Sequence, residues 1–133
     1  MSFNKQLVLN SEYEEVEKVE GLLNELQTNL GFDDEFYARL MLTVSEAATN
    51  GIVHGNKLDP SKKVTVSANA DDSVLTVITT DEGEGFEPEE VANPLAEENL
   101  LKPSGRGVFL MKEYADEVEY QNEGRTLVLK FRL

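Results

Sequence analysis

Three short segments of the chain contain the residues whose types and spacing could do chemistry. In the first, Glu46, Asn50 and His54 recur every four residues, so they would share one stripe of a helix. The oxygen pair of Glu46 and Asn50 suits Mg²⁺, which takes oxygen ligands and keeps several of its waters. Glu46 could also act as a general base on a hydroxyl group or water. A solvated helix face has the same spacing, and a lone histidine near a helix C-terminus more often caps carbonyls or packs.

The second segment is Asp81-Glu82-Gly83-Glu84-Gly85-Phe86, which comes where an expected strand ends. Gly83 and Gly85 would let the flat face of a ligand approach the backbone closely. The Asp81 carboxylate, at a buried strand end, could accept the exocyclic amine of adenine and so favour adenine over guanine. An ordinary acidic turn has the same composition, so this segment alone does not separate the two interpretations.

The third segment runs from Ser104 to Met111 and begins a predicted helix with Gly105, Arg106 and Gly107. Free N–H groups and the helix dipole at such a start favour phosphate. Arg106 adds positive charge in an otherwise acidic chain. The segment lacks the lysine of a Walker motif, so a glycine-rich turn with a solvated arginine explains it equally well.

The surrounding pattern predicts the elements that position these segments. Strands are expected at 5–9, 63–70, 74–80, 117–121 and 126–133, and helices at 11–30, from 33 to about 54, and 107–114. Ser11 and Glu14 have the capping-box pattern at the first helix, which Gly31 would end. Three prolines and no periodicity over 82–104 indicate a functional loop, a lid or a binding loop. The order predicts an α+β fold, a two-layer sandwich with a mixed, mostly antiparallel sheet covered on one face by helices.

Length, composition and charge restrict the class of protein. The 133 residues suit one domain spanning 1–133, and the absence of cysteine excludes disulfides. No apolar stretch is long enough to span a bilayer, and the N-terminus lacks the apolar core of a signal peptide, so we expect a cytoplasmic protein. The net charge of −14 argues against nucleic acid and anionic membranes as partners. It favours a basic protein partner, although it also serves solubility.

In this order, the three segments resemble the anti-sigma-factor serine/threonine kinases. That family belongs to the histidine kinase-like ATPase superfamily, with DNA gyrase, a heat-shock chaperone, histidine kinases and a mismatch-repair protein. Residues 45–55 resemble the family's N box, 81–86 its first glycine box and 105–111 its second. Residues 116–118 and 124–126 also resemble the family's tail. The resemblance covers nearly the whole chain and implies a Bergerat-type ATP-binding fold, with an ATP lid between the two glycine boxes.

The resemblance implies ATP and Mg²⁺ as cofactors, and it assigns roles to individual residues. Glu46 would be the catalytic base and Asn50 the Mg²⁺ ligand. Asp81 would accept the adenine amine, and Thr126 would support it through water. The remaining positions would shape the base pocket and the phosphate cradle, and they are Gly83, Gly85, Gly105, Arg106 and Gly107.

The function implied by the resemblance is that of an ATP-dependent serine kinase and anti-sigma regulatory factor in a partner-switching pathway. Its partners would be a sigma factor, which it sequesters, and a small antagonist protein, which it phosphorylates on a serine. The family also implies a homodimer. Two alternatives stay open: a non-catalytic nucleotide-binding regulatory module that works by protein–protein binding, and a free-standing ATPase in which Glu46 activates water. The presence of Glu46 argues against the first, and the lack of a transducer domain argues against the second.

Overall fold

The structure is a computed structural model that describes residues 3–83, 114–122 and 125–133. Its strands are β1 (Phe3–Asn10), β2 (Lys63–Ala70), β3 (Val74–Thr80), β4 (Glu117–Gln121) and β5 (Thr126–Arg132). Its helical elements are η1 (Tyr13–Val16), α1 (Glu17–Leu30), α2 (Asp34–Thr49) and η2 (Asn50–Gly55). The predicted loop beyond Gly83 and nearly all of the predicted helix 107–114 lie outside the described residues.

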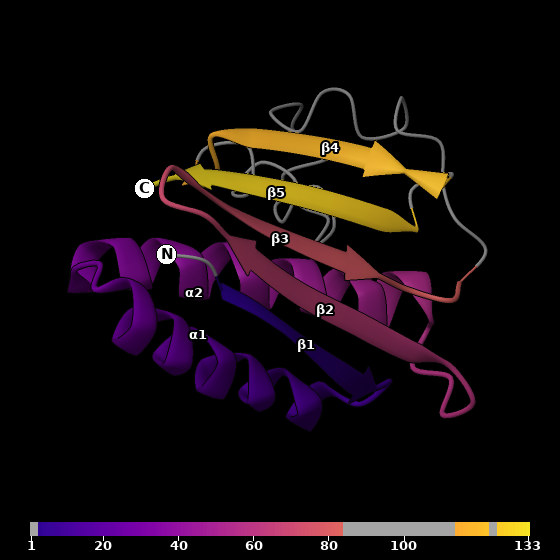
Figure 1. Cartoon of the computed structure of the whole chain (residues 1–133). Coiled ribbons are helices and arrows are strands. Elements are labelled where there is room, and N and C mark those ends of the chain that lie inside the picture. Colours follow the sequence, from indigo (N-terminus) through magenta and orange to yellow (C-terminus); the bar gives the residue numbers. More distant parts are fainter. Residues whose placement is uncertain (1–2, 84–113, 123–124) are drawn as a thin grey trace, which may run out of the picture.

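The five described strands form one sheet in the order β1-β2-β3-β5-β4. Figure 1 shows α1 and α2 side by side along one face of this sheet. The predicted α+β sandwich is confirmed, and every pairing among the described strands is antiparallel rather than mixed. Strand β5 pairs with β3, and β4, which precedes β5 in the chain, lies at the edge of the sheet.

The core lies between the helices and the facing side of the sheet. Strands β2 and β3 alternate buried and more exposed residues along their length, as a half-buried strand requires. The fully or almost fully buried apolar side chains that fill this space include Leu22, Leu23, Leu26, Leu40, Val44, Val64, Val66, Leu75, Val77, Leu129 and Phe131. Their burial is the main source of stability for a chain without disulfides.

The ends of the two long helices follow local sequence signals. Asp33 is the N-cap of α2, and its side chain accepts the Phe36 backbone N–H at 2.9 Å. Gly31 ends α1 in the left-handed conformation with φ of 74°. Both predictions are confirmed. Within the described residues, no helix is both long and apolar enough to cross a bilayer.

The capping box predicted at Ser11 is wrong. Ser11 is buried and donates its hydroxyl to the Lys62 carbonyl at 2.6 Å, far along the chain. The helical region begins instead at η1, whose N-cap, Glu12, makes no side-chain capping bond within the described part of the chain. Glu15 accepts the Asn10 N–H at 2.9 Å, which stabilises the turn after β1. The Ser11 hydroxyl therefore makes a long-range hydrogen bond to Lys62 instead of the predicted helix cap.

Candidate functional site

The helix predicted to continue regularly to His54 changes form after Thr49. From Asn50 to Gly55 it widens into the π-helix η2, and the Asn56 N–H donates to the Gly51 carbonyl, five residues back, at 2.8 Å. Such wide turns are rare and occur often at functional sites. This turn places two glycines over the end of β3.

Glu46 and Asn50 lie one helical turn apart, at the junction of α2 and η2, and both are half-buried. Burial raises the pKa of the Glu46 carboxyl, and the nearby charge of His54 partly opposes that shift. A raised pKa makes the carboxylate a stronger proton acceptor. His54 itself is exposed, so it does not pack in the core.

Asp81 follows β3 directly and is half-buried. Its backbone N–H donates to the Arg125 carbonyl at 2.9 Å, and its Oδ1 accepts the Gly83 N–H at 2.9 Å. Burial raises the pKa of the Asp81 carboxyl, while the Gly83 N–H and the charges of Arg125 and Lys62 oppose that shift. This carboxylate is thus partly removed from water and held in one orientation.

Three glycines allow η2 to approach Asp81. A Cβ atom added at Gly55 would lie 2.5 Å from Asp81 Cγ, and one at Gly51 would lie 3.1 Å from a Val64 methyl and 3.6 Å from Asp81 Cβ. A Cβ at Gly83 would overlap the Gly55 carbonyl oxygen. Only glycine fits at positions 55 and 83, whereas a Cβ at Gly51 would require the Val64 side chain to move by a few tenths of an ångström. Gly51 and Gly55 were not predicted as site residues, although their spacing on the buried side of a helix could have indicated it.

Thr126 lies at the start of β5, opposite Thr80 in the register and next to Asp81. It is buried, its hydroxyl is 3.4 Å from that of Thr80, and it accepts the Asn122 side-chain amide at 2.9 Å. Arg125, which the sequence analysis did not single out, donates its Nε–H to the Gly83 carbonyl at 2.6 Å. The β4–β5 turn therefore supports the segment that carries Asp81.

The structure thus brings two groups of predicted residues together. Glu46 and Asn50 belong to the helical wall, and Asp81, Gly83 and Thr126 belong to the strand wall that η2 contacts. The other predicted positions lie outside the described residues, and they are Gly85, Gly105, Arg106 and Gly107.

The oxygen donors of the helical wall suit a hydrated Mg²⁺ ion held mainly through a nucleotide. Glu46 and Asn50 supply a carboxylate and an amide one turn apart, and Mg²⁺ usually takes one or two protein oxygens together with substrate phosphates. Among the described residues, no group of three or more His, Asp or Glu side chains could hold a metal ion by itself. The donor set therefore fits an ion that arrives with phosphate.

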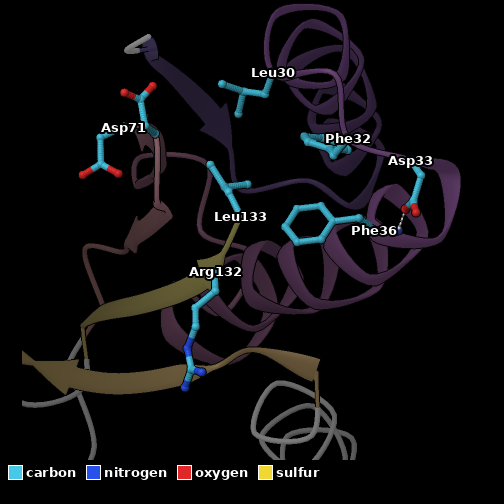
Figure 2. A pocket seen from close by; sticks show the side chains of 8 residues that line it. Leu30, Phe32, Asp33, Phe36, Asp71, Arg132 and Leu133 are labelled. Carbon is cyan, nitrogen blue, oxygen red and sulfur yellow. Dashed lines mark hydrogen bonds between the residues drawn. The ribbon is translucent and has the colours of Figure 1, made fainter.

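A separate hollow of about 520 Å³ lies at the opposite end of β3 and contains none of the predicted site residues. Figure 2 shows its apolar side chains, among them Leu30, Phe32 and Phe36, with Asp33 and Asp71 at the rim. Asp33 caps α2, and Asp71 accepts the backbone N–H groups of its own turn, so both carboxylates have structural roles. We therefore place the candidate site at Asp81.

Comparison with known proteins gives matches over the same region. Residues 9–131 match the family model of the histidine kinase-like ATPase domain. A protein from Geobacillus stearothermophilus named anti-sigma F factor is 39% identical over 92 residues, which cover 65% of this chain and 63% of that protein. A protein of the same name from Clostridium perfringens is 34% identical over 95 residues, covering 68% of each chain. The chain spans less than two thirds of the length of the first relative.

The contact between η2 and Asp81 predicts that a side chain at Gly55 lowers stability, whereas a side chain at an open helical glycine raises it. Gly55→Ala should lower the free energy of unfolding by about 1–3 kcal/mol, because the new methyl group overlaps the Asp81 carboxylate. Gly21→Ala is the matched control. Gly21 lies inside α1, and no atom of the described residues lies within 4 Å of the added Cβ, so this variant should gain about 0.5–1 kcal/mol. Urea unfolding at pH 7 measures both, and a Gly55→Ala protein as stable as the wild type would contradict the contact.

Burial of Asp81 predicts the sign of a pH dependence. Because its pKa is raised on folding, the folded state binds more protons than the unfolded state between the ordinary and the raised pKa, and stability falls as pH rises through that window. Asp81→Asn should therefore be more stable than the wild type at pH 7, and this difference should shrink toward pH 3.8, the ordinary value. Asp59→Asn is the control with the opposite sign, because hydrogen bonds from Ser61 lower the pKa of Asp59. Equal urea midpoints for Asp81→Asn and the wild type at pH 7 would contradict the prediction.

Proposed function

Because this chain belongs to the histidine kinase-like ATPase family, we propose that it binds ATP and acts as a serine protein kinase and anti-sigma regulatory factor. The observation that carries the proposal is the half-buried, oriented Asp81 carboxylate beside a helix that presents Glu46 and Asn50. A carboxylate in that position suits a base with an exocyclic amine. The helical wall then supplies Glu46 as the general base and Asn50 as the metal ligand for phosphoryl transfer.

Asp81 would select adenine by accepting its amine, since guanine presents a carbonyl oxygen there and two acceptors repel each other. The Gly83 N–H already occupies Asp81 Oδ1, which fixes the plane of the carboxylate. Thr126, buried against Thr80, would hold a water at the same edge. Gly85 would complete the base pocket, and Gly105, Arg106 and Gly107 would bind phosphate.

Bound ATP would supply the γ-phosphoryl group, and Mg²⁺ would neutralise its negative charge. Glu46 would accept the proton of a serine hydroxyl as the serine oxygen bonds to phosphorus and the bond from phosphorus to the ADP oxygen breaks. Its raised pKa suits this role, because a carboxylate with partial burial accepts a proton more readily. Asn50 would hold the Mg²⁺ ion and so orient the phosphates. Most of the rate would come from positioning and charge neutralisation.

The proposed partners are a sigma factor and a small antagonist protein that carries the phosphorylated serine. The relatives named anti-sigma F factor support the first, and the net charge of −14 suits partners with basic surfaces. We further propose that the chain is a single domain, acts as a homodimer in the cytoplasm, and switches between these partners according to its nucleotide.

Calorimetric titration with ATP and GTP, with and without Mg²⁺, tests the nucleotide site. We expect Mg²⁺-dependent binding that favours ATP, and a roughly tenfold to hundredfold weaker affinity for ATP in Asp81→Asn, because a hydrogen bond to a charged acceptor contributes about 1.5–3 kcal/mol. Asp59→Asn removes a charge elsewhere and should bind as the wild type does. Absence of binding at millimolar ATP would contradict the proposal.

Phosphate transfer from labelled ATP tests the kinase step. Candidate antagonist proteins from the organism that supplies the chain serve as acceptors, each purified alone. Glu46→Gln should lower the rate of serine phosphorylation by about 10²–10⁴-fold. It should leave the Kd for ATP within a few-fold of the wild-type value, since Glu46 would contact the reacting hydroxyl and not the adenine ring. A wild-type rate in this variant would refute the role of Glu46. Tight antagonist binding without phosphorylation would favour the non-catalytic module, and equal ADP release without any acceptor would favour an ATPase.

A further inference from the structure

Asn56, the residue that follows η2, makes three side-chain hydrogen bonds near the candidate site. It is 1% exposed. Its Oδ1 accepts the Glu82 backbone N–H at 2.8 Å, and its Nδ2 donates to the Lys63 carbonyl and to the Ser11 hydroxyl, each at 3.0 Å. One buried amide thus joins three segments that are distant in sequence.

These bonds connect the two walls of the candidate site. Asn56 is adjacent to Gly55, which contacts the Asp81 carboxylate, and it bonds to the residue directly after Asp81. On the other side, the Asp81 N–H is bonded to the Arg125 carbonyl. The backbone around Asp81 is therefore held at two points, at its own N–H by Arg125 of the β4–β5 turn and at the Glu82 N–H by Asn56.

Loss of the hydrogen bond between Asn56 and the Glu82 N–H would shift Asp81 more than it would destabilise the whole fold. The Glu82 N–H would lose its acceptor, and the exposed backbone at this position would be able to move to find another partner. The Glu82 side chain still accepts the Lys63 N–H, which keeps the segment near β2. A shift of this kind matters at a recognition site, where the groups have to hold their geometry within about 0.5 Å.

We propose that Asn56 is a positioning residue for nucleotide selectivity: its amide fixes the Asp81 carboxylate against η2, in the orientation that favours adenine. The inference rests on the proposed ATP-binding function and adds a residue that touches no part of the nucleotide. Asn56 acts only through the Glu82 backbone.

Ser11 provides a matched control within the same hydrogen-bond network. Ser11→Ala removes the bond from Asn56 Nδ2 and the bond to the Lys62 carbonyl, but it leaves the bond between Asn56 and Glu82 intact. Asn56→Asp is a second comparison, because it keeps an oxygen that can accept the Glu82 N–H and loses the donors to Lys63 and Ser11. These variants separate general destabilisation from the loss of one bond.

The test is the ratio of the Kd values for GTP and ATP, measured by calorimetry with Mg²⁺ in each folded protein. Asn56→Ala should lower this ratio roughly tenfold, since one hydrogen bond to the strand end is lost. Ser11→Ala and Asn56→Asp should keep the ratio within about twofold, even where urea unfolding shows lower stability. An unchanged ratio in folded Asn56→Ala, or an equal loss in Ser11→Ala, would overturn the proposal. If Asn56→Ala does not fold, Asn56→Ser takes its place with the same expectation.

Hydrogen exchange of the nucleotide-free proteins separates this proposal from the proposed function. In Asn56→Ala, the Glu82 amide should exchange at least about tenfold faster than in Ser11→Ala, because only the first variant removes its acceptor. Equal exchange in the two variants would overturn the positioning role whatever the nucleotide affinities are. A wild-type chain without preference for ATP would instead refute the proposed function, and with it the selectivity assigned to Asn56.

Discussion

The close contact between η2 and the Asp81 carboxylate is the constraint on which the arrangement of this molecule depends. It fixes how near the helical layer comes to the end of β3, and it requires glycine at positions 55 and 83, while Gly51 packs close to Val64. The π-helical turn delivers two of these glycines to the strand, and Asn56 then joins the turn to the segment that follows Asp81. Asn50 begins the same turn, and Glu46 lies one turn earlier in α2. The two walls of the site are thus one packing unit.

The candidate site places ionisable groups partly out of water. Two carboxylates, those of Glu46 and Asp81, are half-buried, and both have their pKa raised by the loss of water. Such burial is unfavourable at neutral pH, and the apolar layer between the helices and the sheet has to offset it. The hydrogen bond from the Gly83 N–H and the positive charges of Arg125 and Lys62 reduce the penalty at Asp81 without removing it. Groups held in this way are typical of functional sites.

Local sequence patterns predicted most of the helices and strands, whereas the features that the sequence did not predict depend on contacts between residues far apart in the chain. Alternation of apolar and polar residues located β2 and β3 with their observed bounds, and the signals at Gly31 and Asp33 located the ends of α1 and α2. The π-helical form of η2 could not be predicted, because the residues of a wide turn do not differ from those of an ordinary one. Asp81 was predicted from its place at the end of a strand, and Thr126 was predicted only through the resemblance of the motifs. Asn56 was missed, because its three partners lie up to 45 residues away along the chain.

The strand order of the sheet affects how much the connection between β3 and β4 can vary in length. The chain between β3 and β4 connects two described strands that are not neighbours in the sheet, and it therefore closes a loop between them. The entropy of closing such a loop rises only with the logarithm of its length, and each doubling costs about 0.6 kcal/mol. The segment next to Asp81 can therefore gain or lose residues over evolution at small thermodynamic cost, while the sheet and the helical wall keep their positions.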